Sequence, residues 1–296
     1  MTKNSIICIG SVLWDVIGRT DTAMALGDDV AGRITRIPGG VALNIAIGLA
    51  AYGMQPVLLT MIGHDAEGAD LLAFCEKRGM NCDHIFRSPD WPTDHYMAIE
   101  AQGQVMAAIA DAHGLEAAGA QILAPLEHGP LGDAAAPYQG VVALDGNLTA
   151  TLLAYVADAP AFQAADLRIA PASPGKATRL CPLLHHPMVS LYVNRREACL
   201  IAGQAPDLSA TDAADALIAA GAARVIVTDG AGLTVDAKAG AETVTGTPPQ
   251  VTATRATGAG DRFMAAHIAA ETGGASRQEA QIFALNEAAA YVAGKD

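Results

Sequence analysis

The sequence predicts an α/β fold built on a parallel sheet that helices cover. Hydrophobic residues make up 51% of the 296 residues but aromatic ones only 4%, so aliphatic side chains dominate, as they do in buried parallel sheets. Apolar runs alternate with segments of helical periodicity, and repeated strand–helix units imply right-handed crossovers between parallel strands. Residues 12–37 and 93–110 break this rhythm and are predicted to form a separate small sheet.

The elements of the first half follow from short patterns. Residues 5–10 (SIICIG) form an apolar run ending in Gly, which predicts a buried strand and a turn. Alternation in residues 32–37 (GRITRI) predicts a strand with one solvated face. The patterns that follow predict a helix over 42–53, a buried strand over 56–63, a helix over 66–79 and a hairpin within 93–111.

Strands and helices alternate regularly in the second half. Strands are predicted over residues 140–146, 166–172, 189–194 and 223–230, and helices over 149–159, 195–203 and 210–221. Residues 232–248 are predicted to form a small antiparallel insert, and an Ala-rich helix begins at Arg277. No internal repeat or low-complexity linker divides the sequence, so we expect residues 1–296 to form one domain.

Composition excludes several classes of protein. The net charge of −13 argues against a nucleic-acid binder, which needs a basic patch. No apolar run is long enough to span a membrane, and the first residues lack the features of a secretion signal. The five scattered cysteines form no Cys-x-x-Cys pair, so neither a zinc site nor a disulfide framework is indicated. We therefore expect a cytoplasmic protein.

Residues 255–263 (RATGAGDRF) carry the clearest chemical signal. Gly258 and Gly260 allow a close backbone approach, and the helical pattern that follows places the amides of Ala259, Gly260 and Asp261 at a helix N-terminus, which suits an anion. An acid beside an anion site suits proton abstraction, and phosphoryl transfer to a hydroxyl requires that pair. The plainer interpretation of Asp261 is a helix cap.

Two further segments could bind hydroxyl groups. Gly39 and Gly40 permit a tight turn, and Asn44 follows about one helical turn later, where its amide suits a sugar hydroxyl. Asp15 follows the first strand closely, and ligands of open α/β sheets gather beyond strand ends. Asn44 could also be a solvent-exposed side chain, and Asp15 an ordinary turn residue.

Two strand ends suit a nucleotide and its metal. Asn194 and Glu197 are three residues apart after a strand, so they share a helix face, and oxygen ligands suit Mg²⁺. Thr228, Gly230 and Gly232 follow another strand, where glycines would let a nucleotide lie on the backbone. A surface helix and a hairpin turn would explain these residues equally well. The sequence contains no phosphate loop, because residues 173–178 (SPGKAT) lack the first glycine.

Together and in this order, these segments resemble the ribokinase-like, or PfkB, family of sugar and nucleoside kinases. Residues 39–53 are similar to its first signature, residues 256–270 to its second, and residues 62–85 to the intervening stretch. The resemblance covers nearly the whole chain. It implies a three-layer α/β/α sandwich with a β-sheet lid, and transfer of a phosphoryl group from ATP, with Mg²⁺, to a primary sugar hydroxyl.

The resemblance also implies roles for individual residues. Asp261 corresponds to the base, and Gly258, Ala259 and Gly260 to the anion hole. The remaining correspondences are Asp15, Gly39, Gly40 and Asn44 with sugar contacts, Asn194 with a phosphate contact, Glu197 with the Mg²⁺-water region, Thr228, Gly230 and Gly232 with nucleotide contacts, and Asn286 with a position near adenine.

Within the family, four short segments are most similar to pseudouridine kinases, and one of them, residues 255–261 (RATGAGD), resembles their form of the second signature. Residues 92–99 and 106–112 resemble their lid strands, and residues 143–149 resemble a further segment. They suggest Thr93, Asp111 and Asn147 as base or ribose contacts, although lid-surface or turn positions would explain them too. Kinases of ribose, adenosine or 2-keto-3-deoxygluconate are alternatives, and Arg33 and Arg36 could bind the acid group of the last. A non-catalytic ligand sensor is a further alternative, which an intact base disfavours.

Departures from the family pattern carry their own expectations. Arg255 replaces an aspartate common in a region that helps bind a monovalent cation, and its positive charge disfavours such a cation. Lids of this family commonly pair, so the resemblance implies a homodimer formed through the lid. We expect a small sugar or nucleoside as substrate, and neither a nucleic-acid polymer nor a membrane as partner.

Overall fold

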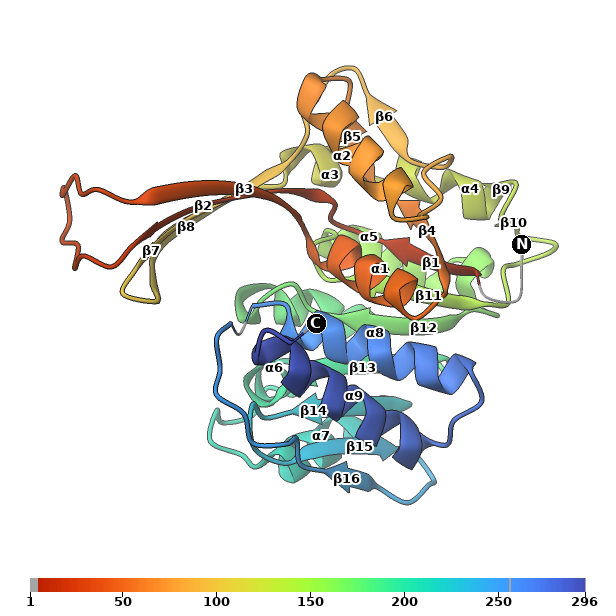
Figure 1. Ribbon diagram of the computed structural model, residues 1–296. Coiled ribbons are helices and arrows are strands. Elements are labelled where there is room, and N and C mark those ends of the chain that lie inside the picture. Colours follow the sequence, from red (N-terminus) through yellow and green to blue (C-terminus); the bar gives the residue numbers. More distant parts are fainter. Residues whose placement is uncertain (1–4, 256, 296) are drawn as a thin grey trace.

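An eight-stranded sheet forms the centre of the computed structural model, which describes residues 5–255 and 257–295 (Figure 1). Its strand order is β16–β15–β14–β13–β12–β11–β1–β4. Neighbours from β14 to β4 pair in parallel, whereas β15 and β16 are antiparallel. The strands are β1 (Ser5–Ile9), β4 (Gln55–Leu59), β11 (Val141–Asp145), β12 (Asp166–Ala170), β13 (Val189–Asn194), β14 (Arg224–Thr228), β15 (Thr234–Lys238) and β16 (Val244–Gly246).

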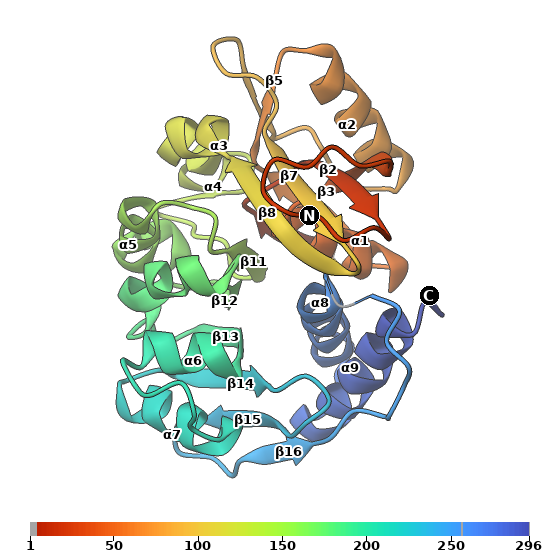
Figure 2. The ribbon, with the colours of Figure 1, turned by 90° about the vertical axis from the view of Figure 1, so that its left-hand side faces the viewer.

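Helices cover both faces of this sheet (Figure 2). One face carries α3 (His113–Ala118), α4 (Ala124–Glu127), α5 (Ala150–Asp158), α6 (Arg195–Ile201) and α7 (Ala210–Ala219). The other carries α1 (Val41–Ala51), α2 (Ala66–Lys77), α8 (Ala259–Thr272) and α9 (Arg277–Val292). Strand alternation separates the two cores, because Ile7 and Ile9 of β1 pack on one side and Ile6 and Cys8 on the other. The predicted three-layer α/β/α sandwich is confirmed.

A second sheet, the lid, projects from the body (Figure 1). Its order is β3–β2–β7–β8, formed by β2 (Leu13–Thr20), β3 (Arg33–Gly39), β7 (His95–Ala101) and β8 (Gln104–Asp111). The β7–β8 hairpin turns at Gln102 and Gly103, whose φ angles of 50° and 77° are those of a tight two-residue turn. The strands come from the two segments that the sequence sets apart.

Two predicted elements differ in detail. The strand predicted over residues 56–63 is divided, because β5 (Met61–Gly63) leaves the main sheet and pairs with β6 (Phe86–Ser88). The antiparallel insert predicted over residues 232–248 is the edge of the main sheet. The other short elements are β9 (His128–Gly129), β10 (Gly132–Asp133) and 3₁₀ segments at Gly119–Leu123, Pro160–Phe162 and Pro174–Leu183. Within the described ranges, no helix has the length and apolar character needed to cross a membrane.

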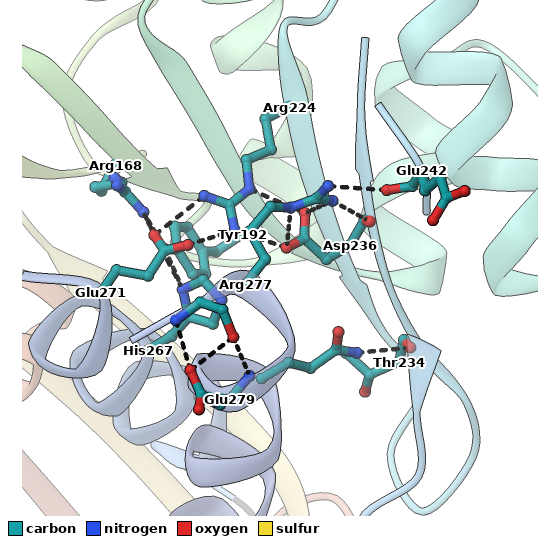
Figure 3. A network of polar contacts seen from close by, with 12 residues as sticks. Arg168, Tyr192, Arg224, Thr234, Asp236, Glu242, His267, Glu271, Arg277 and Glu279 are labelled. Atoms are coloured by element: carbon teal, nitrogen blue, oxygen red, sulfur yellow. Dashed lines mark hydrogen bonds and ion pairs between the residues drawn. The ribbon is translucent and has the colours of Figure 1, made fainter. Parts of the chain in front are cut away.

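A buried network of charged side chains fixes α8 to the sheet (Figure 3). Glu271, in the last turns of α8, binds Arg168 of β12 and Arg224 of β14, with 2.8 Å between Arg224 Nη2 and Glu271 Oε1. Arg224 also binds Asp236 of β15, which Arg277 at the start of α9 binds as well. The network therefore connects three strands to the two C-terminal helices and sets the position of α8 on the sheet.

Candidate active site

A pocket of about 590 Å³ lies at the carboxyl ends of the parallel strands. Loops after β1, β11, β12, β13 and β14 line it, together with the first turns of α1 and α8 and side chains of the lid. Open α/β sheets bind ligands at this edge. The predicted site residues that line it are Asp15, Gly40, Asn44, Asn147, Asn194, Glu197, Thr228, Gly230, Gly258, Gly260 and Asp261.

The N-terminus of α8 forms the floor of this pocket. Gly258 is the N-cap and has a left-handed φ of 85°, and a Cβ there would lie 2.6 Å from the Tyr291 hydroxyl. Glycine is therefore needed for both conformation and space. Ala259 begins the helix, and Gly260 and Asp261 complete its first turn. Amides at a helix start lack partners within the helix, so they can bind an anion.

The carboxyl group of Asp261 is held by α1. Its Oδ2 accepts a hydrogen bond from Asn44 Nδ2 at 2.9 Å. Burial raises the pKa of Asp261 to about 7, the Asn44 bond opposes this, and the carboxylates of Asp145, Glu197 and Asp15 add to the rise. A carboxyl group with this pKa can take up a proton near neutral pH.

The glycine pair before α1 makes room for neighbouring parts of the chain. A Cβ on Gly40, whose φ is 101°, would lie 2.4 Å from the Ser11 carbonyl oxygen. A Cβ on Gly39 would lie 2.1 Å from an Asp15 carboxylate oxygen, although Gly39 itself does not line the pocket. Asp15 can thus fold against the base of α1, where burial raises its pKa to about 6.

A network around Asp145 joins the loops on this side of the pocket. The fully buried Asp145 accepts hydrogen bonds from Ser11 N and Oγ, at 2.7 and 2.6 Å, and from the amides of Ala42 and Asn147. Asn147 donates to Ser11 Oγ at 2.8 Å and accepts from Lys176 Nζ at 2.7 Å. Lys176 is the only Lys or Arg among the described residues that line the pocket.

Sequence reasoning missed Ser11, Tyr96 and Lys176, which line the pocket, and Asp145, which binds Ser11. Ser11 and Asp145 lie at the ends of predicted strands, and Lys176 follows another within residues 173–178. The rule that ligands gather at strand ends would have selected these three, whereas Tyr96 has no distinct signal.

Four of the residues predicted to bind the nucleotide or its metal lie on the other side of the pocket, namely Asn194, Glu197, Thr228 and Gly230. Asn194 and Glu197 form a capping box at α6, in which each side chain accepts a hydrogen bond from the other's amide at 2.9 Å. Glu197 is 7% exposed, and its burial raises its pKa. Thr228 ends β14, and Gly230 lies in the turn before β15 with a φ of 58°. Gly232 closes that turn through a bond to Asp229 and does not line the pocket.

Glu197 is the residue predicted for the metal region. Among the described residues, no group of three or more His, Cys, Asp or Glu side chains could hold a metal. One oxygen of Glu197 is bound to the Asn194 amide, and its carboxyl group lines the pocket. This donor set fits Mg²⁺, which commonly takes most of its ligands from phosphates and water.

Several predicted residues lie outside the pocket, so their proposed roles stay predictions. Thr93 is buried and donates to Asp65 Oδ1 at 2.7 Å, Asp111 is exposed and contacts His113, and Asn286 is exposed on α9. Ala259, Arg33 and Arg36 also do not line the pocket. The Arg255 guanidinium stacks on the Tyr291 ring, 3.7 Å from its centroid.

Both a protein-family model and individual known proteins that are similar to this chain are those of kinases. Residues 3–295 match the model of the family described as pfkB family carbohydrate kinase. Pseudouridine kinase of Escherichia coli is 30% identical over 202 residues, which are 68% of this chain but only 62% of that protein. An uncharacterized sugar kinase of the same organism is 33% identical over 51% of this chain and 40% of its own length.

Solved structures of kinases have the same fold as this chain. A carbohydrate kinase from Agrobacterium tumefaciens superimposes with a TM-score of 0.79 at 25% identity, covering 97% of this chain and 90% of that one. A ribokinase of Arabidopsis thaliana complexed with ribose and ATP has the same fold, with a TM-score of 0.76 at 19% identity, covering 99% of this chain and 93% of that one. The chain belongs to the pfkB family of carbohydrate kinases.

Proposed function

We propose that this protein transfers the γ-phosphoryl group of ATP to the 5′-hydroxyl of a ribosyl substrate, with pseudouridine as the first candidate. The observation that carries the proposal is Asp261, a carboxyl group with a pKa of about 7 in the first turn of a helix that opens into the pocket. The same turn offers both a proton acceptor and amide donors for negative charge. Phosphoryl transfer to an alcohol needs this combination.

In the proposed mechanism, one side of the pocket binds the acceptor and the other side binds the nucleotide. Asp15 and Asn44 hold the acceptor, and Asp261 takes the proton of its hydroxyl as the oxygen attacks the γ-phosphorus in line. The amides of the first turn of α8 stabilise the transferred group. Asn194, Thr228 and Gly230 contact the nucleotide. Glu197 is the residue that would hold Mg²⁺ through water, and the ion would supply charge neutralisation on the phosphates. The lid excludes water from the acceptor.

Replacement of the base tests the activity. Asp261→Asn keeps the shape of the side chain but cannot take a proton, so kcat should fall by roughly 10²–10⁴-fold. ATP consumption coupled to ADP release would measure this, with Asp207→Asn in the exposed loop between α6 and α7 as control. Near-normal turnover by Asp261→Asn on the true substrate would rule out the mechanism.

A substrate screen separates the candidates. ATP consumption with Mg²⁺ would be compared across pseudouridine, uridine, adenosine, ribose and 2-keto-3-deoxygluconate. The 30% identity to pseudouridine kinase of E. coli supports pseudouridine, and selective turnover over uridine is the expected result. Lys176 favours the sugar acid as second candidate, because Lys176 lines the pocket, whereas Arg33 and Arg36 do not. Binding without turnover would favour the ligand sensor.

We also propose that two copies of the chain pair through their lids. Large apolar side chains are exposed on the lid strands, namely Ile34, Ile37, Met97, Ile99, Val105, Met106 and Ile109. Monomeric soluble proteins rarely leave so many such groups together in water. A second copy of the same sheet would cover them.

A further inference from the structure

At the base of the lid, one residue in the first turn of α2, Glu67, contacts several lid strands at once. Its carbonyl oxygen accepts a hydrogen bond from Trp14 Nε1 of β2 at 2.9 Å. Its carboxylate binds Arg36 Nη1 of β3 at 2.7 Å and lies 3.0 Å from His95 Nε2 of β7. Three of the four lid strands therefore meet at Glu67.

The residues that reach Glu67 are chain neighbours of residues that line the pocket. Trp14 precedes Asp15 on β2, and His95 precedes Tyr96 on β7. The register pairs Trp14 with His95 and Asp15 with Tyr96. Successive side chains of a strand point to opposite faces, so the contacts with Glu67 on one face fix the direction of Asp15 and Tyr96 on the other.

Packing strengthens these contacts. The Arg36 guanidinium stacks over the Trp14 ring, 4.3 Å from its centroid, and Trp14 is only 7% exposed. Arg36 Nη2 also lies 3.4 Å from Asp70, one turn further along α2. The Glu67 side chain is 43% exposed, so each ion pair alone contributes little, and its effect lies in geometry.

We infer that Glu67 is a positioning residue that sets where the lid presents Asp15 and Tyr96 to the acceptor substrate. This inference rests on the proposed kinase function. Loss of the carboxylate removes the contacts of Arg36 and His95 with Glu67. Fewer bonds to the start of α2 then remain, from Trp14 to the Glu67 carbonyl oxygen, from Arg36 to Asp70 and from Thr93 to Asp65, so Asp15 and Tyr96 can move away from the acceptor. The nucleotide half of the pocket does not touch this attachment, so its contacts should not change.

Kinetics of Glu67→Ala and Glu67→Gln test the inference, with Glu76→Ala, exposed at the far end of α2, as matched control. Loss of two partly exposed ion pairs should raise the KM for the acceptor about 3- to 10-fold in the Ala variant. The KM for ATP should stay within about 2-fold, and ATP hydrolysis without transfer should increase because the lid excludes water less well. Glu67→Gln can still accept a hydrogen bond and should lie between Ala and wild type.

Hydrogen exchange separates this inference from the proposed function. In the absence of substrate, the amides of β2 and β7 should exchange faster in Glu67→Ala than in the wild type or Glu76→Ala. Unchanged exchange would overturn the inference whether or not the wild type is active. Faster exchange with an unchanged acceptor KM would show a purely structural role and would also overturn it. A wild type that phosphorylates no compound of the screen, but whose exchange responds as expected, would refute the proposed function alone.

Discussion

Asp261 is subject to opposing influences that set its chemistry. The helix N-terminus and Asn44 favour its charged form, whereas burial and three neighbouring carboxylates favour the neutral form. The second group prevails, and the pKa rises to about 7. Ionisation of Asp261 therefore costs free energy in the folded protein. This cost is relieved when the carboxylate accepts the proton of a substrate hydroxyl that attacks the phosphoryl donor.

The pH dependence of catalysis follows from this pKa. The base must be ionised, so kcat/KM should be level above about pH 7 and fall about tenfold per pH unit below it. Asn44→Leu removes the hydrogen bond that favours the charged form and should move the acidic limb to higher pH. Initial rates from pH 5 to 9 would measure both profiles. A limb near pH 4 in the wild type would contradict the assignment of Asp261 as an activated base.

The same carboxyl group should destabilise the fold at alkaline pH. Its pKa rises from 3.8 to about 7 on folding, so the penalty is complete above pH 7, shrinks as the pH falls and vanishes below about 3.8. Asp261→Asn should therefore melt at a higher temperature than the wild type at pH 8, with a smaller difference at pH 5. Calorimetry at the two pH values would measure it, and an equal difference at both would contradict the prediction.

At the scale of the element, α8 carries the proposed base in its first turn and a network of charged side chains near its end. Asp261 lies in its first turn, and Glu271 lies near its end between Arg168 and Arg224. Although burial opposes ionisation, these contacts hold the pKa of Glu271 at about 2. His267 lies between the two ends, where burial lowers its pKa to about 4 and keeps it neutral beside the Tyr192 hydroxyl. The charges at the far end thus fix the first turn in the pocket.

Removal of this charge should be costly. Glu271→Gln removes the carboxylate that two buried guanidinium groups share, although Arg168 keeps Asp166 and Arg224 keeps Asp236. The free energy of unfolding should therefore fall by roughly 1.5–3 kcal/mol, the contribution of a hydrogen bond to a charged group. Urea denaturation at pH 7 would measure the loss, with Glu76→Gln as the exposed control. Because the folded pKa is depressed, the stabilisation is present above pH 4.5 and disappears towards pH 2, where variant and wild type should become equal.

At the scale of the whole molecule, the lid should determine the oligomeric state. Ile109→Lys and Met97→Lys place charges on exposed lid strands and should convert a dimer into a monomer. Ile282→Lys is the matched control, because Ile282 is as exposed as Met97, at 50%, but lies on α9. Light scattering coupled to size exclusion would measure the mass. A wild type that stays monomeric at micromolar concentrations would contradict pairing through the lid.

Local patterns predicted most of the fold, because hydrophobic periodicity and the glycines that end helices and strands can be read from residues that are close together in the sequence. They also located Asp261 and Asn44, which lie in the first turns of helices that follow Gly-rich turns, and Asp15, which lies shortly after the end of β1 in the lid strand β2. Contacts between distant segments could not be predicted in this way. Ser11 and Asp145 are 134 residues apart, and an apolar run such as residues 56–63 does not reveal that its end pairs with a different sheet.

The lid and the body line different parts of the pocket. Exchanging lids between relatives is therefore a practical route to new kinases. The lid strands contribute Leu13, Asp15, Tyr96 and Ala110, whereas Asn194, Thr228 and Gly230 follow strands of the body. Each lid hairpin enters and leaves the body close to Glu67 or Asp94, so a graft needs few junctions. A chimera with a foreign lid should keep its phosphate donor while changing its acceptor, provided that the transplanted strands can still reach a carboxylate at the start of α2.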